Sequence, residues 1–528
     1  MAIAPFSLRE DYWETFKIKK SDLEFLYNHL LELETPLTSK ELIDTLINKR
    51  IQTEKASLKA QQESGGMVYR PKDHYQAGQS LLFPQLNWQK GVVNNVREGH
   101  NPQLPAFDVI EVTMANGAKH QFAAGLAEHA LNQPIEVNLN DPKLNFKVVM
   151  ETYGDQLQES LEQALEDDQD LVRIASRWFP RALLVDVNIG HLNLAEAVLD
   201  MAGGGPLDSK ALVEQIDLPT DVNSKLVEFS LNYGLQEDER FDEIGPTGEI
   251  VWFLHRLEPE AVQHTPVYLQ YSPVSYDRSV LTQEMLSLER QIDDDLSDLH
   301  DVYPRTNDLS IVLSYPHWRA GTLPLTHRTR VMFPTAIDAP RIQFTLFDVD
   351  TKEKLPAWVV RPGHYIYGLR DWFERQGLMP GNIIHIRPGN QAGEVLIQAE
   401  KRRSNREWIR TVLVGTDGGL VFAMLKQVVN AAFDERSAIA IPDVKAIDNL
   451  WEQPASKRAP LAGIALNMMR ELSKLNLQGH VHAQELYAAV NVVRRCPPGP
   501  IFQILATQPV YKHVGDLHFR LDENPEEI

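Results

Sequence analysis

The sequence contains a single cysteine, Cys496, among its 528 residues. One cysteine cannot form a disulfide within the chain and cannot build a cluster of thiolate metal ligands. We expect it to be a small buried apolar residue. The sequence also lacks a run of about 20 apolar residues that would span a bilayer, and its first residues lack the pattern of a secretory signal. These absences predict a cytoplasmic protein with no membrane partner.

Motifs of nucleotide binding and hydrolysis are missing as well. The sequence has no Gly-x-x-x-x-Gly-Lys phosphate loop, no Gly-x-Ser-x-Gly elbow and no His-Glu-x-x-His pair. Gly203-Gly204-Gly205 lacks the lysine of a nucleotide cradle, and we interpret it as a hinge. His480 and His482 alternate as strand residues do, but no third metal ligand accompanies them. We therefore expect no enzymatic activity, no metal ion and no cofactor.

The sequence has fewer basic than acidic residues, 52 against 73, which gives a net charge of −21. This surplus disfavours attraction of the whole surface to phosphate. One acidic run, Asp155 to Asp170, holds seven acids and no base. A second run consists of Asp293, Asp294, Asp295, Asp298 and Asp301. We interpret both as solvated helix faces, with docking surfaces for a basic partner as the alternative. A two-metal nuclease site would need carboxylates on rigid strands, whereas the second run has a helical pattern.

Three segments combine short amphipathic helices with a following extended run, which is the order of a winged helix. The first opens with the capping box Ser21 to Glu24 and continues after a second box, Thr38 to Glu41. The next segment ends in the apolar run Ile250 to Leu254. The last ends in two expected strands, Val510 to His513 and Leu517 to Leu521.

Two further segments have the pattern of β structure. Tyr75 to Phe122 has turn signals about every ten residues, including Asn116-Gly117, and this predicts a small barrel. Ile311 to Val414 is rich in strands, with one helix expected at Tyr367 to Arg375. Four aromatic residues of the first barrel are expected in its core, with a binding groove as the alternative. They are Phe83, Trp88, Phe107 and Phe122.

Two resemblances to known families rest on these segments. Glu34 to Ile51, with a Pro-Leu-Thr turn that leads straight into an amphipathic helix, resembles the HARE-HTH family of winged helices, and His482 to Arg520 is similar in order. That family occurs in the delta subunit of bacterial RNA polymerase and beside restriction and chromatin modules, so the resemblance implies a DNA or transcription context. Phe344 to Ile397 resembles the DNA-binding pseudobarrel of plant transcription factors and some restriction enzymes. The matching residues are Trp372-Phe373 and the turn Gly377 to Gly381 before a strand.

The pattern as a whole predicts an α+β multidomain protein in which winged-helix modules are combined with a small SH3-like β-barrel and a pseudobarrel β-domain. The expected domains are a winged-helix-like helical domain at 1–64, a small β-barrel at 65–150, an acidic helical connector at 151–184, a winged-helix-like domain at 185–305, a β-rich pseudobarrel-like domain at 306–455 and a C-terminal winged-helix-like domain at 456–528.

A short basic segment is the best candidate for contact with nucleic acid. Its members are Lys401, Arg402, Arg403, Arg406, Trp408 and Arg410. Basic side chains contact phosphate, and an interleaved aromatic ring can stack on a base. The alternative is a solvated hairpin edge whose arginines pair with Glu400 and Glu407. Arg494-Arg495 stands at the end of an expected helix, and we interpret it as a complement to the helix dipole.

These observations predict a DNA-binding or transcription-associated protein that is not an enzyme. The expected partners are duplex DNA and, for the acidic segments, a protein such as an RNA polymerase. Two alternatives stay open. A protein-interaction scaffold without DNA contact is favoured by the net charge. The targeting subunit of a restriction or defence system would need a separate catalytic chain.

Overall fold

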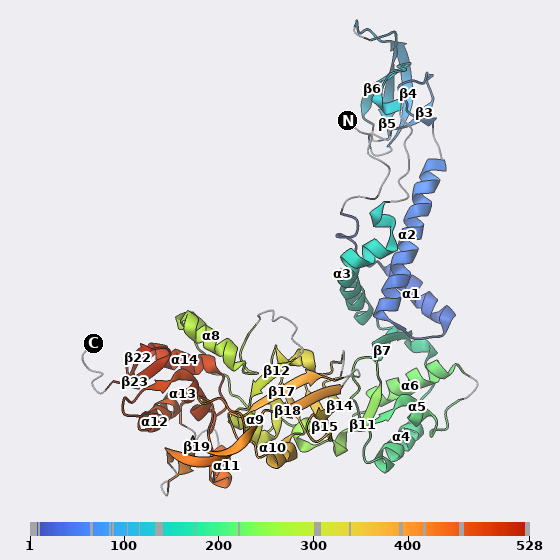
Figure 1. The fold of residues 1–528 in the computed structure, drawn as a ribbon. Coiled ribbons are helices and arrows are strands. Elements are labelled where there is room, and N and C mark those ends of the chain that lie inside the picture. The colour runs from blue at the N-terminus through green and yellow to red at the C-terminus, as the bar shows by residue number, and fades with distance from the viewer. Residues whose placement is uncertain are drawn as a thin grey trace. The chain divides into compact units, whose positions relative to one another are not determined.

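The computed structural model describes residue 8 and residues 11–63, 67–83, 86, 89–102, 104–115, 117–132, 141–174, 176–219, 222–299, 308–336, 339–389, 394–415, 419–452 and 459–522. This part of the chain is an α+β protein with several separate sheets (Figure 1). Residues group into two compact units, Met1–Leu184 and Val185–Ile528. No helix in the described ranges is long and apolar enough to cross a membrane.

The first unit contains three helices and a three-stranded sheet that share one core. The helices are α1 (Lys20–Leu33), α2 (Ser39–Glu63) and α3 (Phe146–Glu166), and the strands are β1 (Leu37–Thr38), β7 (Leu171–Ile174) and β8 (Arg177–Pro180). The strands are ordered β1-β8-β7, so the short strand before α2 pairs with the second strand of a later hairpin. Leu26, Leu42 and Leu161 are fully buried in the shared core. The segment that we expected to be a separate connector, 151–184, thus supplies most of the third helix and the hairpin of this fold.

The first acidic run lies on the solvent side of α3. Leu157, Leu161 and Leu165 recur at every fourth residue and are buried, whereas the acids between them are exposed or half-buried. Every fourth residue returns to the same side of a helix, so the acids fall on the opposite side. The expected solvated helix face is confirmed for the acids up to Glu166, whereas Asp167, Asp168 and Asp170 follow the end of the helix.

A five-stranded sheet occupies the chain between α2 and α3. Its strands are β2 (Met67–Val68), β3 (Ser80–Phe83), β4 (Gln89–Glu98), β5 (Asp108–Met114) and β6 (Lys119–Ala124), in that order across the sheet. All neighbours are antiparallel except β2 and β3, which are parallel. The strands predicted within Tyr75 to Phe122 are therefore confirmed.

Aromatic side chains fill the core of this sheet. Phe83 is buried, and the ring of Phe122 stacks on it with 4.4 Å between the centroids. Phe107 is half-buried. Trp88 and Asn116 lie outside the described residues. The core interpretation is thus confirmed for Phe83 and Phe122.

The element order of the helical part of the first unit recurs twice in the second unit. One set is α4 (Ile189–Met201), β9 (Leu207–Asp208), α5 (Ser209–Val213), α6 (Ser224–Gln236), β10 (Phe241–Glu243) and β11 (Val251–Leu254). The other is α12 (Leu461–Ser473), β21 (Val481–His482), α13 (Ala483–Val490), α14 (Pro498–Thr507), β22 (Tyr511–Gly515) and β23 (His518–Leu521). Their sheets are ordered β10-β11-β9 and β21-β23-β22, so in each set the short first strand again pairs with the last strand.

A curled seven-stranded half-barrel lies between these two sets in the sequence. Its strands are β12 (Leu309–Val312), β13 (Thr322–Pro324), β14 (Arg341–Asp348), β15 (Lys354–Val360), β16 (Tyr365–Tyr367), β17 (Ile383–Pro388) and β18 (Glu394–Ala399). The order is β12-β17-β18-β14-β15-β16-β13, and only β14 and β18 are parallel neighbours. The connections include the helices α9 (Tyr315–Ala320) and α10 (Arg370–Gln376). Trp372 and Phe373 of α10 are buried in the core, and the Trp372 indole N–H donates to Asp348 Oδ2 at 2.8 Å.

A long two-stranded hairpin and several short helices complete the second unit. The hairpin consists of β19 (Lys401–Val414) and β20 (Leu420–Ala431), and the remaining α-helices are α7 (Glu260–Gln263), α8 (Gln283–Ile292) and α11 (Val444–Trp451). Single 3-10 turns across both units are η2 (Ala130–Asn132), η3 (Pro142–Leu144), η4 (Arg181–Leu183), η5 (His255–Leu257), η6 (Arg278–Val280) and η7 (Thr329–Met332).

Candidate nucleic-acid interface

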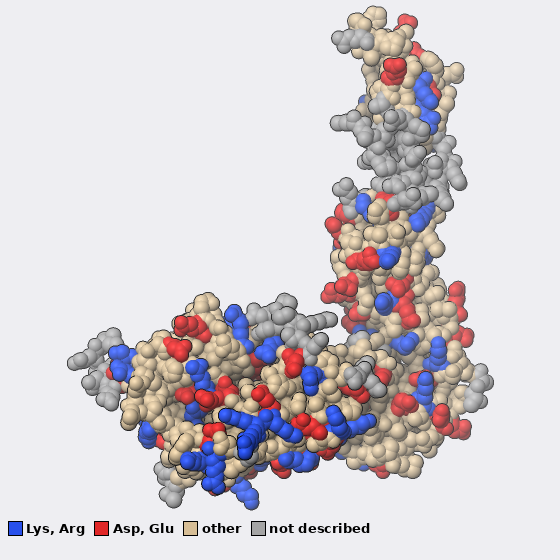
Figure 2. Space-filling model, viewed as in Figure 1, with Lys and Arg blue, Asp and Glu red and all other residues tan. Residues whose placement is uncertain are grey.

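All six candidate residues lie on strand β19. The strand pairs antiparallel with β20, and its register shifts between Lys401 and Asn405. Such a bulge interrupts the regular alternation of side chains between the two faces of a strand. The consecutive residues Arg402 and Arg403 are accordingly both exposed. Figure 2 shows Lys and Arg side chains gathered over the region where Figure 1 labels β19 and α10.

Beyond the bulge, an aromatic ring and two cations share one face of the hairpin. Arg406 lies opposite Val428, and Trp408 lies opposite Lys426. Trp408 is 60% exposed, and the Lys426 ammonium lies 5.4 Å from the centroid of its ring, within cation–π range. Val428 is also exposed. This face therefore presents an open indole ring beside positive charge.

The cations of the segment differ in how far they are already neutralised. Lys401 Nζ lies 3.0 Å from an Asp350 carboxylate oxygen, and the Arg402 guanidinium lies 3.6 Å from Glu407. The side chains of Arg403 and Arg406 make no ion pair or hydrogen bond with any residue in the described ranges. These two arginines are thus the groups most available to a phosphate.

Arg410, in contrast, is buried. It is only 9% exposed, and its guanidinium pairs with Glu485 of α13 and donates to the backbone carbonyl of Arg436 at 3.1 Å. Glu485 also accepts from the backbone N–H of His482, which fixes the start of α13. The structure therefore places Arg410 as a link between the hairpin and the C-terminal helices, apart from the exposed candidates.

Sequence reasoning missed Lys426, which the structure places across from Trp408. A signal was available in the sequence, because Thr411 to Met424 has the pattern of a hairpin with a turn at 416–419, and such a turn sets the residue opposite each strand position. Residues 416–418 of that turn lie outside the described part of the chain. The described pairing of the two strands ends at Val414 and Leu420.

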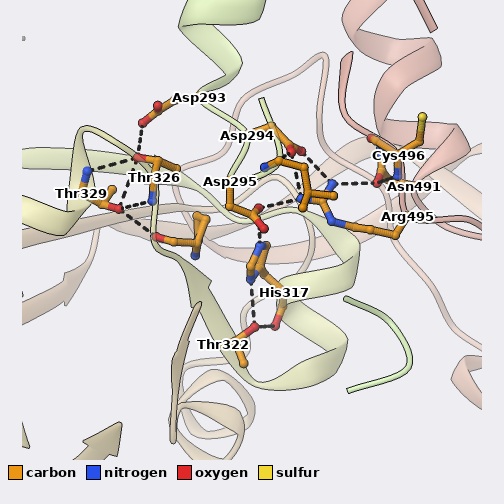
Figure 3. Close-up of polar contacts among 12 residues, drawn as sticks. Asp293, Asp294, Asp295, His317, Thr322, Thr326, Thr329, Asn491, Arg495 and Cys496 are labelled. Carbon is orange, nitrogen blue, oxygen red and sulfur yellow. Dashed lines mark hydrogen bonds and ion pairs between the residues drawn. The ribbon is translucent and has the colours of Figure 1, made fainter. Parts of the chain in front are cut away.

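The second acidic run forms part of a buried ion network (Figure 3). The Arg495 guanidinium donates to both carboxylate oxygens of Asp294, at 2.7 and 2.9 Å, and to Asp295 Oδ1 at 2.6 Å. His317 Nε2 lies 2.9 Å from the same oxygen of Asp295. All four side chains are buried. The expected solvated helix face is wrong for Asp294 and Asp295, and so is the helix-dipole role for Arg495, because each group is needed to neutralise the others.

Within this network, three residues have the order of a carboxylate, an imidazole and a hydroxyl. Asp295 contacts His317, and His317 Nδ1 lies 2.9 Å from Thr322 Oγ1. A nucleophilic relay uses this order, but it needs a hydroxyl that a substrate can reach. Thr322 is fully buried, and Arg495 already pairs with the carboxylate. The arrangement therefore has a structural role.

The lone thiol lies beside the same network. Cys496 is fully buried, and its backbone N–H donates to Asn491 Oδ1 at 3.1 Å. Burial raises the pKa of the Cys496 thiol to about 12, so the reactive thiolate is not populated at neutral pH. The expectation of a small buried residue is confirmed.

Comparisons with models of known protein families, with curated proteins and with solved structures find no match to this chain.

Proposed function

We propose that this chain is a non-enzymatic DNA-binding protein associated with transcription, and that the β19–β20 hairpin holds the phosphate backbone of duplex DNA. The observation that carries the proposal is the pair Arg403 and Arg406, two exposed arginines without a partner among the described residues, beside the exposed ring of Trp408. Exposed guanidinium groups are common phosphate ligands in protein–DNA complexes.

The repeated element order supports this assignment. Each of the three sets has a helix, a short strand, two further helices and a hairpin, with the short strand paired to the last strand. We take these sets as winged-helix modules, the first of them interrupted by an SH3-like barrel between its second and third helices. We take the half-barrel as a DNA-binding pseudobarrel. In such an assembly a helix of one module approaches a groove while the hairpin arginines fix the position of the backbone.

A salt titration of duplex binding tests the proposal. Each phosphate contact releases counterions, so the logarithm of the affinity falls with the logarithm of salt concentration at a slope of about −0.9 per contact. Replacing both Arg403 and Arg406 by alanine should therefore flatten the slope by about 1.8. Fluorescence anisotropy of a labelled duplex at several salt concentrations measures this change.

A matched variant controls for net charge. Arg256 and Lys147 are exposed basic residues outside the region of β19 and α10 that already lie near carboxylates, at 2.5 Å from Asp200 and 3.8 Å from Glu151. Replacing these two by alanine removes the same two positive charges and should leave the slope unchanged. Equal slopes for both double variants, or no duplex binding by the parent protein at low salt, would contradict the proposal and favour a protein-interaction scaffold.

A further inference from the structure

Two carboxylates and an imidazole meet beside the β10–β11 hairpin of the second unit. Asp242 lies on β10, His255 begins the turn η5, and Glu258 follows that turn. One ligand atom from each residue lies within 4.8 Å of the others. Three ligand atoms this near one another form a candidate site for an ion that would draw them closer, and the three residues lie far from the arginines of β19 in the sequence.

Glu258 is the unusual member of the group. It is 4% exposed, and neither of its carboxylate oxygens accepts a hydrogen bond from a donor group among the residues that the structure describes, while its closest polar contact is with the carboxyl group of Asp242. The nearest basic nitrogens are His255 Nδ1 at 3.5 Å and Arg341 Nη1 at 3.7 Å, both beyond the usual hydrogen-bond length. A buried carboxylate in this situation calls for a closer positive group.

Arg341 satisfies only one of the two carboxylates. Its Nη1 donates to Asp242 Oδ2 at 2.6 Å, and its Nε donates to the carbonyl of Val262 at 3.2 Å. This contact orients Asp242 and leaves Glu258 without a cationic partner at hydrogen-bond distance.

We propose that Asp242, His255 and Glu258 bind one divalent transition-metal ion of the zinc type. One imidazole nitrogen and two carboxylate oxygens match the ligands that zinc accepts, with a water molecule in the fourth position, whereas calcium takes six to eight oxygens. The backbone of the site is held in place, since the Gln263 side chain donates to the carbonyls of His255 and Glu258 at 2.8 and 2.9 Å. His255 is half-exposed and gives the ion a path from solvent.

This proposal departs from the sequence-based expectation of a metal-free protein. The spacing of the three ligands matches no metal motif, and only the antiparallel pairing of β10 with β11 brings Asp242 next to His255 and Glu258. The competing explanation is a proton shared between Asp242 and Glu258, which would also remove the repulsion of the two carboxylates.

Metal analysis of the full chain separates the two explanations. The protein and three variants, His255→Ala, Glu258→Gln and His264→Ala, are stripped with a chelator and dialysed against Zn²⁺ at a pH of about 8, where imidazole is neutral. His264 is an exposed histidine of the same segment and serves as the matched control. Elemental analysis should find one more zinc per chain in the parent and in His264→Ala than in the other two variants. Zinc should also raise the midpoint of thermal unfolding only in the parent and in His264→Ala.

Equal zinc content in all four proteins would show surface binding only and would overturn the proposal. No zinc in the parent, together with a Glu258→Gln variant at least as stable as the parent, would assign the site to the shared proton. Unfolding midpoints of the stripped proteins show whether each variant folds. Should Glu258→Gln fail to fold, His255→Ala gives the same readout, because it removes a half-exposed ligand and leaves both carboxylates in place.

Discussion

Arg495 is the residue whose removal should destabilise the second unit most clearly. Its guanidinium makes three hydrogen bonds to Asp294 and Asp295, at 2.6 to 2.9 Å, and the three side chains are 1 to 5% exposed. Replacing Arg495 by methionine keeps most of the side-chain volume but leaves two carboxylates buried without their cation. Removing one partner of a buried ion pair costs about 3–5 kcal/mol. We expect a loss in the upper half of this range, because one cation serves two anions.

The neighbouring Arg494 provides the control. Its side chain donates to the backbone carbonyl of Ala459 at 3.2 Å and lies at the surface. Arg494→Met should therefore change the free energy of unfolding by only about 0.5 kcal/mol. Urea unfolding followed by circular dichroism measures both variants. Because a unit of several modules can unfold in more than one transition, hydrogen exchange of the amides in α14 should show where stability is lost.

Two results would refute this reasoning. A loss below about 1 kcal/mol for Arg495→Met would mean that water or rearrangement compensates the two carboxylates, contrary to the cost of an unpaired buried charge. An equal loss of unfolding free energy in Arg494→Met would mean that any change after the end of α13 destabilises this region, whether or not it removes the cation of Asp294 and Asp295. A second change, Asp294→Asn, made together with Arg495→Met should restore part of the stability, because it removes one of the unpaired charges.

Two more predictions concern acid and the first unit. Burial alone would raise the pKa of Asp295, but the charges of Arg495 and His317 hold it well below its usual range. The ionised Asp295 therefore contributes its full stabilisation above the unfolded-state pKa of about 3.9, and this contribution declines as the pH falls below that value. The urea midpoint of the parent should decline over the same pH range. The midpoint of Arg495→Met should not show this decline. In the first unit, Leu161→Ala should cost about 2–5 kcal/mol because the side chain is fully buried, and Glu159→Ala on the exposed side of the same helix should stay within about 0.5 kcal/mol. Similar urea midpoints for these two variants would contradict the buried face of α3.

Local signals in the sequence predicted many of the elements. The capping box at Thr38 and Glu41 is present, since the Thr38 N–H donates to Glu41 at 2.8 Å and the Glu41 N–H donates to Thr38 Oγ1 at 3.2 Å. The box expected at Ser21 to Glu24 is shifted. The structure instead caps α1 at Lys19, whose N–H donates to Asp22 at 2.9 Å. Both helices were predictable because capping depends on residues three positions apart.

Pairing across long separations was not predictable in this way. Leu37 and Thr38 pair with Trp178 and Arg177, although the whole five-stranded sheet lies between them in the sequence. Helical periodicity and turn signals report only on nearby residues, so the acidic segment 151–184 was interpreted as a connector. Its apolar stripe was visible, but the sequence contained no sign that α1 and α2 would cover it.

At the candidate interface, too, contacts between residues far apart in the sequence could not be predicted. Arg406 and Arg410 are four residues apart on one strand, and alternation places them on the same face. Only Arg410 meets Glu485, which comes 75 residues later, and is buried by that contact. A run of basic residues therefore predicted where positive charge gathers, while the assignment of each side chain to packing or to solvent depended on the C-terminal helices.

The buried positions of some acidic residues also make the net charge a weaker argument against binding of phosphate. The value of −21 counts Asp294 and Asp295, which are buried and matched by Arg495 and His317, in the same way as acids on an exposed helix face. At an ionic strength of about 0.1 M, exposed charges more than about 10 Å apart are largely screened from one another. In the proposed complex, a phosphate at β19 would therefore be affected mainly by the nearest groups. Acids elsewhere would lower the attraction at long range, but contact would depend on whether Arg403 and Arg406 stay free of Asp350 and Glu407.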